Sequence, residues 1–252
     1  MRRLDGKHVV LTGAAGGIGS LVASLLGKAG AHLIGIDRLE CLECDETIIA
    51  DLASEDGLST LSGKLANRHV DILVNVAGMQ YFGPFECQDP ANIRLGFLVN
   101  LVAPATLIRA VLPQMQARRA GQIVNIGSVL GSINYPYFAT YSSGKAGLKG
   151  LSEGLRRELH GTGIDVTHIS PRAARTAFNT AAVNRFMAIT GMKADKPNVV
   201  AERIVEAILA RRKDVSIGFR ERQFIRINAL LPRLIDAGIA PQTRKARRQL
   251  FQ

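Results

Sequence analysis

Tyr141 and Lys145 are the residues best suited to chemistry, and they stand four positions apart in the segment YSSGK. Two side chains at this spacing lie on one face of a helix. A free tyrosine has a pKa of about 10 and is a weak base at neutral pH, whereas a lysine cation one turn away would favour its phenolate. The pair therefore predicts a tyrosine that exchanges a proton with a substrate. Chance also produces this spacing in many helices, so the hypothesis needs support from other positions.

Ser128 gives that support. It stands thirteen residues before Tyr141, just after the apolar run 122–126, which we predict to be a strand. A hydroxyl at the end of that strand would meet the same ligand space as the tyrosine. A serine, a tyrosine and a lysine placed together could bind a substrate oxygen and move its proton.

A glycine-rich turn at residues 12–19 (TGAAGGIG) follows the first apolar run and opens a helical pattern. Such a turn lets backbone N–H groups and the helix N-terminus approach a pyrophosphate. Asp37 ends the next apolar run, 18 residues beyond Gly19, where a carboxylate could accept hydrogen bonds from ribose hydroxyls. It would repel a 2′-phosphate, although the neighbouring Arg38 could pair with one. NAD(H) is the expected cofactor, and NADP(H) remains an alternative.

Strands that alternate with helices would position these groups. Apolar runs predict strands at residues 8–11, 32–36, 47–50, 71–76, 122–126, 164–169 and 215–217. Helical spacing predicts helices at residues 21–28, 58–67, 92–117, 141–160 and 200–211. This alternation implies right-handed crossovers and a parallel sheet covered on both faces. We predict one doubly wound α/β domain that binds its ligand beyond the carboxyl ends of the strands.

The glycine-rich turn, the segment at 75–78 (NVAG), Ser128 and the Tyr141/Lys145 pair resemble, in order and spacing, the short-chain dehydrogenase/reductase family. The resemblance covers residues 5–218 and implies a single Rossmann-like domain, 1–218, with a seven-stranded parallel sheet. Residues 219–252 would then form a C-terminal helical extension that many relatives lack. The resemblance also implies an NAD(P)(H)-dependent oxidoreductase that interconverts an alcohol and a carbonyl.

The resemblance implies a catalytic group of Asn100, Ser128, Tyr141 and Lys145. Asn100 would hold a water in a proton relay that reaches Lys145. Ser128 would hydrogen-bond the substrate oxygen, and Tyr141 would give or take the hydroxyl proton. Lys145 would also bind the nicotinamide ribose.

The family's cofactor contacts can be carried over in the same way. Asp51 and Leu52 would contact the adenine, and Thr176 the nicotinamide carboxamide. The predicted cofactor residues are Gly13, Gly17, Ile18, Gly19, Asp37, Arg38, Asp51, Leu52, Asn75, Ala77, Gly78, Tyr141, Lys145, Pro171 and Thr176. The chain departs from the family at Arg172, where a glycine usually follows the proline. A side chain at this turn could reshape the nicotinamide end.

Residues 173–196, where the family places its substrate loop, are rich in apolar side chains. They favour a hydrophobic secondary alcohol or ketone as substrate, although they could simply pack the loop onto the domain. One alternative function is a 3-oxoacyl-thioester reductase, in which Arg118 and Arg119 would meet an acidic carrier protein. These arginines could equally complement a helix C-terminus. An alternative from another class is a catalytically silent dinucleotide sensor or membrane scaffold.

Positive charge is concentrated in residues 219–252, which hold eight basic and two acidic residues within a chain of net charge +11. Apolar residues at 227, 230, 231, 234 and 235 follow one helix face, with Arg222, Arg226 and Arg233 on the opposite side. Pro232 predicts a kink or two short helices. We expect this extension to pack on protein, and contact with an anionic membrane is the alternative. Nucleic acid is disfavoured because no stacking aromatics are interleaved with the charge.

The remaining features suggest a reduced, cytoplasmic setting. No apolar run approaches the ~20 residues that span a bilayer, and residues 1–7 lead into the first strand without a signal-peptide pattern. Three cysteines do not make a disulfide framework, and the lone pair Cys41/Cys44 lacks two further ligands for zinc. We expect no metal site. The family resemblance further implies a homo-oligomer, a dimer or tetramer, built through the two long helices.

Overall fold

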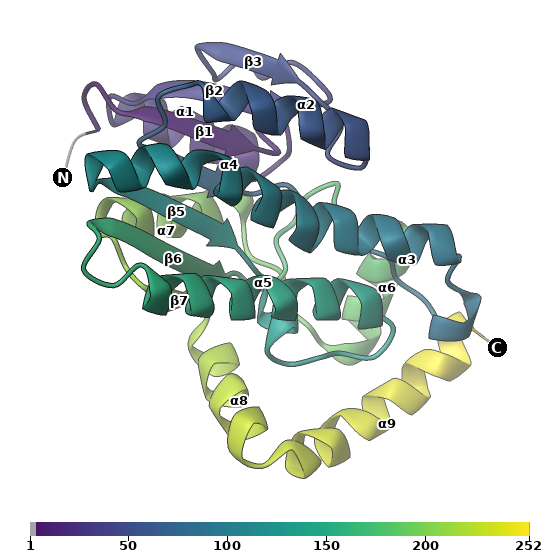
Figure 1. Ribbon diagram of the computed structural model, residues 1–252. Coiled ribbons are helices and arrows are strands. Elements are labelled where there is room, and N and C mark those ends of the chain that lie inside the picture. Colours follow the sequence, from purple (N-terminus) through teal and green to yellow (C-terminus); the bar gives the residue numbers. More distant parts are fainter. Residues whose placement is uncertain (1–3, 252) are drawn as a thin grey trace.

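The fold is a parallel sheet of seven strands (Figure 1), seen in a computed structural model that describes residues 4–251. The strand order is β3-β2-β1-β4-β5-β6-β7, and every neighbouring pair is parallel. The chain reverses its direction of winding between β1 and β4, which is where doubly wound sheets bind ligands. The strands are β1 (His8–Thr12), β2 (His32–Asp37), β3 (Glu46–Ile49), β4 (Ile72–Asn75), β5 (Gly121–Ile126), β6 (Ile164–Ser170) and β7 (Asp214–Ser216).

Helices cover both faces of the sheet and make a three-layer domain (Figure 1). One face is packed by α1 (Gly19–Lys28) and α7 (Pro197–Leu209). The other face is packed by α2 (Glu55–Ala66), α4 (Ala103–Arg118) and α5 (Ala139–Glu158). The strands carry near-continuous apolar runs because side chains on both of their faces are buried.

The predicted fold class is confirmed: each strand and helix expected from the apolar patterns is present, with boundaries shifted by a few residues. Short connecting turns of 3₁₀ helix, η1 (Phe85–Cys87) and η3 (Val129–Gly131), were not expected. Apolar periodicity does not mark such turns, because they are too short to repeat it.

The long helix predicted at residues 92–117 is interrupted. It consists of α3 (Pro90–Phe97), a π-helical turn η2 (Leu98–Val102) and α4. Asp89 caps its start, since its side chain accepts a hydrogen bond from the backbone N–H of Ala91 at 2.8 Å. A π-turn inside a helix often marks a functional position, and this one contains Asn100.

The same helical run, 90–118, is long and apolar enough to cross a membrane by length and composition. Its most apolar part has a mean hydropathy of 1.9 and is 50% buried inside the protein. We did not expect a run of this kind from the sequence, because single polar residues divide it. Burial against the sheet is the ordinary reason for such a composition in a core helix.

The chain after β7 forms two helices, α8 (Phe219–Leu230) and α9 (Pro232–Leu250), which extend away from the sheet and then return toward α6 (Ala181–Thr190) (Figure 1). The break predicted at Pro232 is present, because proline starts a helix readily but interrupts its interior. The second helix is longer than expected, and α6 within the substrate loop was not predicted.

Candidate active site

A cavity of about 560 Å³ opens at the carboxyl edge of the sheet, as expected for a doubly wound fold. The turns that follow six of the strands form its walls. The predicted site residues that line it are Gly13, Gly17, Ile18, Gly19, Asp37, Arg38, Asp51, Leu52, Ala77, Gly78, Ser128, Tyr141, Lys145, Pro171 and Thr176. Two predicted site residues, Asn75 and Asn100, are absent from this lining.

The glycine-rich turn packs against the loop that follows β4. Gly13 has a φ of 69°, and a Cβ at this position would lie 2.8 Å from the backbone nitrogen of Ala77. A Cβ on Gly19 would lie 1.9 Å from the carbonyl oxygen of Gly13. Thr12 secures the contact, because its hydroxyl accepts a hydrogen bond from the Ala77 N–H at 3.2 Å. The cavity wall is therefore bare backbone here, which suits a pyrophosphate.

Asp37 lies at the end of β2, beside the glycine-rich turn. Its carboxylate accepts hydrogen bonds from the backbone N–H groups of Ala15 at 3.0 Å and Arg38 at 2.7 Å. These bonds orient the carboxylate at the position expected to contact a ribose. The Arg38 side chain is exposed and also borders the cavity. Asp37, which would favour NAD(H), and Arg38, which could pair with the 2′-phosphate of NADP(H), thus lie side by side.

Asn75 lies next to the cavity but outside its lining. We expected it in the wall of the cofactor site, but its side chain is buried within the sheet. Its amide nitrogen donates to the Asn125 side-chain oxygen at 2.8 Å, and Asn125 donates to the Ser152 hydroxyl at 2.9 Å. Asn75 therefore joins β4 to β5 and, through Asn125, to α5. A polar network of this kind supports the strand ends that carry the site.

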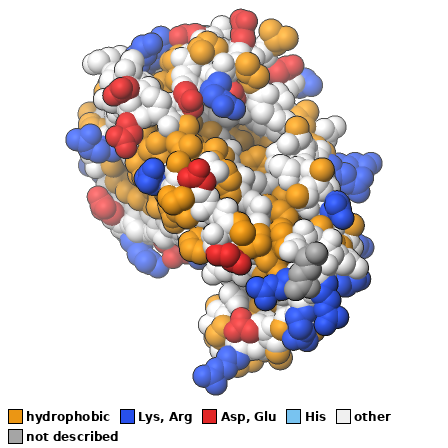
Figure 2. Space-filling view, turned by 90° about the vertical axis from the view of Figure 1, so that its right-hand side faces the viewer, with side chains coloured by type: hydrophobic (Ala, Val, Ile, Leu, Met, Phe, Trp, Pro, Cys, Tyr) orange, Lys and Arg blue, Asp and Glu red, His pale blue; other side chains and the backbone are white. Residues whose placement is uncertain are grey.

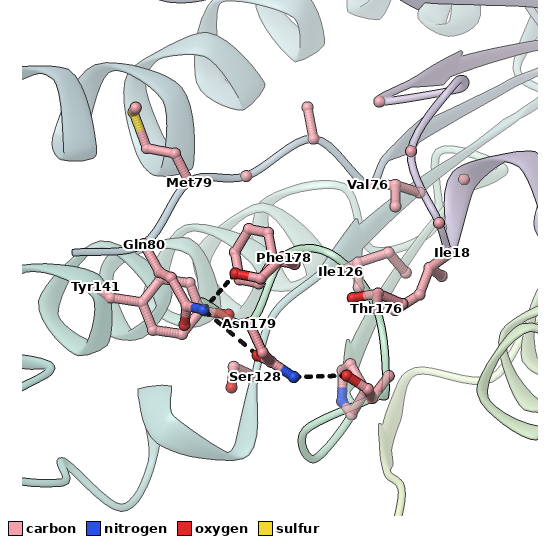
Figure 3. A pocket seen from close by; sticks show the side chains of 18 of the residues that line it. Ile18, Val76, Met79, Gln80, Ile126, Ser128, Tyr141, Thr176, Phe178 and Asn179 are labelled. Atoms are coloured by element: carbon pink, nitrogen blue, oxygen red, sulfur yellow. Dashed lines mark hydrogen bonds between the residues drawn. The ribbon is translucent and has the colours of Figure 1, made fainter. Parts of the chain in front are cut away.

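Ser128 and Tyr141 lie together on one side of the cavity (Figure 3). α5 carries Tyr141 and Lys145 on one face, and Ser128 follows the end of β5. The Lys145 ammonium donates to the Ile126 carbonyl oxygen at 2.9 Å and lies 6.0 Å from the centroid of the Tyr141 ring. The predicted group of Ser128, Tyr141 and Lys145 is thus assembled in space.

Burial dominates the titration of this group. It raises the pKa of Tyr141 to about 12, although a hydrogen bond with Ser128 acts in the opposite direction. It lowers the pKa of Lys145 to about 8, because the ammonium loses its hydration. We expected the lysine cation to bring the tyrosine pKa down toward neutrality. The structure shows the opposite direction, because the cost of burying a phenolate outweighs the hydrogen bond with Ser128.

Asn100 is fully buried in the π-turn η2. Its amide donates to the Met79 carbonyl oxygen at 2.7 Å and accepts from the Met79 N–H at 3.2 Å. A Cβ on Gly78 would lie 3.1 Å from the Asn100 Oδ1 and 3.4 Å from the Lys145 Nζ, so Gly78 fills the space between these groups. Asn100 therefore holds the loop after β4, and its part in a proton relay stays a prediction.

A polar contact across the cavity was missed by the sequence analysis. The Gln80 side chain donates to the Phe178 carbonyl oxygen at 2.7 Å and to the Asn179 side-chain oxygen at 3.4 Å (Figure 3). The Phe178 ring lies 6.1 Å from the Tyr141 ring, measured between centroids. The loop after β4 and the substrate loop are thus joined in front of the tyrosine. No local pattern marks Gln80, because its partners lie about a hundred positions away.

Arg172, the departure from the family pattern, lines the cavity and joins three segments. Its guanidinium binds Asp195 through two hydrogen bonds, of 2.7 and 2.5 Å, and Glu221 at 3.2 Å. Asp195 ends the substrate loop and Glu221 belongs to α8. These carboxylates raise the pKa of Arg172 further above its usual range. The Arg172 side chain thus links the turn after β6, the substrate loop and α8. It is therefore not free to enter the nicotinamide end of the cavity.

The rest of the cavity is apolar. Phe138, Val183, Met187 and Met192 line it on the side away from the glycine-rich turn. Behind them lies an aromatic cluster formed by Phe82, Tyr135, Tyr137, Phe186 and Phe251. The predicted apolar character of this side is present, and many of its residues pack the loop and the cavity wall at once.

Helix α9 covers this cluster from outside. The Tyr135 hydroxyl donates to the Gln242 side-chain oxygen at 2.6 Å, and Phe251 lies 4.7 Å from the Tyr137 ring. Ala246 is fully buried in the same contact. One face of the extension therefore packs on protein, as we preferred on sequence grounds.

Comparison with known proteins agrees with this geometry. The sequence profile described as "short chain dehydrogenase" matches residues 7–185. A zebrafish protein named dehydrogenase/reductase SDR family member 7B is 30% identical, over 96% of this chain and 87% of its own length. A ketoacyl reductase, HetN, from a Nostoc strain is 30% identical, over 86% of this chain and 80% of its own.

A solved structure shares the fold as well. A short-chain dehydrogenase from Sphingobium yanoikuyae in complex with NADPH superimposes with a TM-score of 0.78. It is 27% identical and covers 91% of this chain and 95% of its own. The glycine-rich turn and the tyrosine–lysine pair define a dinucleotide-dependent oxidoreductase site on a doubly wound sheet. The chain belongs to the short-chain dehydrogenase/reductase family.

Proposed function

We propose that the protein interconverts a hydrophobic secondary alcohol and its ketone, with NAD(H) preferred over NADP(H). The oxidoreductase class follows from the family, whereas the substrate class and the cofactor preference are the proposal. The apolar wall that borders the same cavity as Tyr141 is the observation that carries it.

The substrate side has a single polar end. Ser128 and Tyr141 offer hydroxyl groups there, while Phe138, Val183 and Met187 border the remaining space. A pocket of this kind fits a molecule with one carbonyl or hydroxyl group and a large apolar substituent. The Arg172 guanidinium, which also lines the cavity, is occupied by two carboxylates and is not free to bind a charged substrate.

The preference for NAD(H) rests on Asp37. Its carboxylate is held beside the glycine-rich turn by backbone N–H groups, and a 2′-phosphate in this place would be repelled. Arg38 acts in the opposite sense, and the Sphingobium relative binds NADPH. We favour NAD(H) because the Asp37 carboxylate is held by backbone hydrogen bonds, whereas the Arg38 side chain is exposed.

The chain's own residues account for the proton chemistry. The cradle of glycine backbone and Asp37 fits a dinucleotide, which when bound would accept or supply the hydride. Ser128 would hydrogen-bond the substrate oxygen and orient it toward the Tyr141 hydroxyl, which gives or takes the proton. With its pKa raised to about 12, Tyr141 keeps its proton at neutral pH and is ready to act as the acid in ketone reduction. Lys145 would bind ribose and hold positive charge beneath the tyrosine.

A 3-oxoacyl-thioester reductase is the second candidate. The similarity to the Nostoc ketoacyl reductase favours it, and the apolar wall would also fit an acyl chain. Arg118 and Arg119 give it less support than we expected. They precede β5 at the amino edge of the sheet, opposite the cavity, and Arg118 donates to the Val70 carbonyl oxygen at 2.8 Å. These arginines fit the helix-terminus role instead.

Titration with NADH and NADPH, followed by nicotinamide fluorescence, tests the cofactor proposal directly. Ketones with aliphatic, steroid and acyl-thioester groups would then be offered with the preferred cofactor. Turnover of apolar ketones supports the proposal, and exclusive turnover of 3-oxoacyl thioesters supports the second candidate. Binding of dinucleotide without turnover of any member would favour a silent sensor or scaffold.

Asp37→Ala should reduce the ratio of NADH to NADPH affinity by about tenfold, because one charge-assisted hydrogen bond to ribose is lost. Glu40→Ala is the matched control, since Glu40 is exposed three positions away and does not line the cavity. Both affinities would be measured by fluorescence titration. An unchanged ratio in the Asp37 variant would show that the carboxylate does not face the ribose.

A further inference from the structure

The junction of α8 and α9 exposes an unusual group of apolar side chains. We name residues 219–234 the elbow. Within it, Phe219, Phe224, Leu230, Leu231 and Leu234 have exposed fractions of 73%, 50%, 79%, 59% and 60%. Exposed large apolar residues are ordinary when scattered singly, whereas a cluster marks an interaction surface.

The sequence placed Leu230, Leu231 and Leu234 on one apolar helix face together with Ile235. The structure divides that face. Ile235 is buried at 8% exposure, and α9 continues to pack through Ala246. The three leucines fall at the break before and after Pro232, where the chain has run away from the sheet and turns back toward α6 (Figure 1). The contact with the protein therefore leaves them uncovered.

Four exposed arginines belong to the same two helices as these leucines. Arg220, Arg222, Arg226 and Arg233 are exposed, and in the described part of the chain none of them forms an ion pair. The single acidic residue of the elbow, Glu221, is engaged by Arg172. Farther along α9, a second group of basic residues at 244–248 is also exposed. Figure 2 shows basic side chains gathered over the lower part of the molecule, where the two helices lie.

We propose that the elbow docks on an anionic membrane surface, with its leucines in the outer part of the bilayer and its arginines against lipid phosphates. Apolar side chains framed by unpaired arginines match the chemistry of that interface, where both kinds of group find partners at the same depth. Each arginine near such a surface also gains from its negative potential.

A second copy of the chain is a poorer occupant. A two-fold contact through the elbow would bring Arg222, Arg226 and Arg233 of both copies together, because each residue meets the same surface on its partner. The repulsion would add to that between two chains of net charge +11. An anionic bilayer instead neutralises this charge, and its binding weakens when salt is added.

The start of α8 reaches the active site. Glu221 at the start of α8 lines the cavity, and Asn228 donates to the Ser132 carbonyl oxygen at 2.8 Å. A docked elbow would therefore hold the apolar end of the cavity near the lipid, from which a membrane-dissolved ketone or alcohol could reach Tyr141. This step rests on the proposed function, whereas docking itself does not.

The test is sedimentation of the purified full chain with vesicles. One set would be phosphatidylcholine alone, and the other would contain roughly one third phosphatidylglycerol. The elbow variant Leu230→Ser/Leu231→Ser/Leu234→Ser is compared with the control Leu42→Ser/Ile49→Ser, whose leucine and isoleucine are 90% and 61% exposed elsewhere on the domain. NADH or NADPH fluorescence verifies that each variant is folded.

The unaltered chain and the control should bind the anionic vesicles, and added salt should weaken that binding. The elbow variant should bind at least roughly tenfold more weakly, because three buried aliphatic side chains are lost from the bilayer. Equal binding by the elbow variant and the unaltered chain would overturn the proposal. Failure of the unaltered chain to bind anionic vesicles would also overturn it. If, in that case, the elbow variant had a different oligomeric state from the unaltered chain, the elbow would be a contact between two copies of the chain. None of these outcomes depends on turnover, so the proposed function is judged separately.

Discussion

The two ends of the cavity are built from different parts of the chain. At the dinucleotide end, backbone atoms form the wall, and they belong to turns fixed directly to buried strands. At the substrate end, side chains form the wall, and they come mainly from a long loop and α6, with Glu221 added from α8. The first end has no room for a side chain at Gly13 or Gly19, whereas the second can change its shape by exchanging one apolar side chain for another. Such a division conserves the chemistry while leaving the substrate free to vary.

The largest expected effect lies where the two ends meet. Tyr141→Phe removes the hydroxyl that exchanges the proton, and kcat should fall by roughly a thousandfold or more. Dinucleotide affinity should change by less than about twofold, because the ring still fills its place. Steady-state kinetics and fluorescence titration measure the two quantities. Tyr135→Phe is the control, since its hydroxyl contacts Gln242 instead of the cavity. Undiminished turnover in Tyr141→Phe would refute the proposed acid/base role.

A second prediction concerns the cost of burying Lys145. Its pKa is about 8 in the folded protein and 10.5 when exposed, so between these values the unfolded chain binds the proton that the folded protein has lost. Stability therefore rises with pH across this window, by on the order of 3 kcal/mol from this group. Tyr141 has the opposite effect at higher pH, because its pKa of about 12 exceeds the ordinary value of 10.

Lys145→Met should remove the rise in stability with pH that comes from the buried Lys145. The difference in unfolding free energy between the variant and the unaltered protein would be measured by urea titration at pH 7 and pH 10. The variant should be relatively more stable at pH 7 than at pH 10, although it should lack activity. A pH-independent difference would mean that Lys145 stays fully charged in the folded protein.

Gly13→Ala tests the claim that backbone forms the dinucleotide end. The new methyl group would meet Ala77, and φ would remain in the left-handed region, at a cost of roughly 2–4 kcal/mol in stability or dinucleotide affinity. Gly63→Ala is the matched control, because α2 has open space at that position and alanine favours a helix by up to about 1 kcal/mol. Urea titration and NADH binding report both effects. Equal behaviour of the two variants would contradict the distinction between the ends.

The smallest expected effect belongs to the substrate end. Arg172→Gly restores the family's usual residue and releases Asp195 and Glu221, so the substrate loop and α8 should lose their common anchor. KM for a ketone substrate should rise by about tenfold. The effect stays at this size because the ion pairs are partly exposed. Dinucleotide affinity should change by less than about twofold. Arg203→Ala is the control, since it breaks an exposed ion pair with Glu206 on α7. A change confined to dinucleotide affinity would show that Arg172 acts on the dinucleotide end of the cavity and not on the substrate end.

Local spacing explains which features the sequence could predict. Tyr141 and Lys145 share a helix face, and Gly13 and Asp37 follow strands, so their positions are determined by a few neighbouring residues. The direction of the Asn75 side chain was not predictable, because strand periodicity does not tell whether a residue at the end of a strand turns toward the cavity or toward Asn125. The pKa of Tyr141 was misjudged because helix spacing contains no information on the depth of burial.

The substrate end was less predictable for a related reason. Its contacts join residues about a hundred positions apart, such as Tyr135 with Gln242 and Gln80 with Phe178. No periodic pattern connects such partners. Arg172 was recognised as unusual, but its partners Asp195 and Glu221 become apparent only once the loop and α8 are placed in space.

One loop serves both ends of the cavity. Thr176 lies against Gly17, where a Cβ would come within 3.0 Å of its methyl group, and Phe178 lies near Tyr141. These loop residues are only two positions apart, so displacement of the loop would uncover the dinucleotide site and the substrate site together. We expect departure of the product and of the spent dinucleotide to share one activation barrier. Both departures would require the hydrogen bonds from Gln80 to Phe178 and Asn179 to break first.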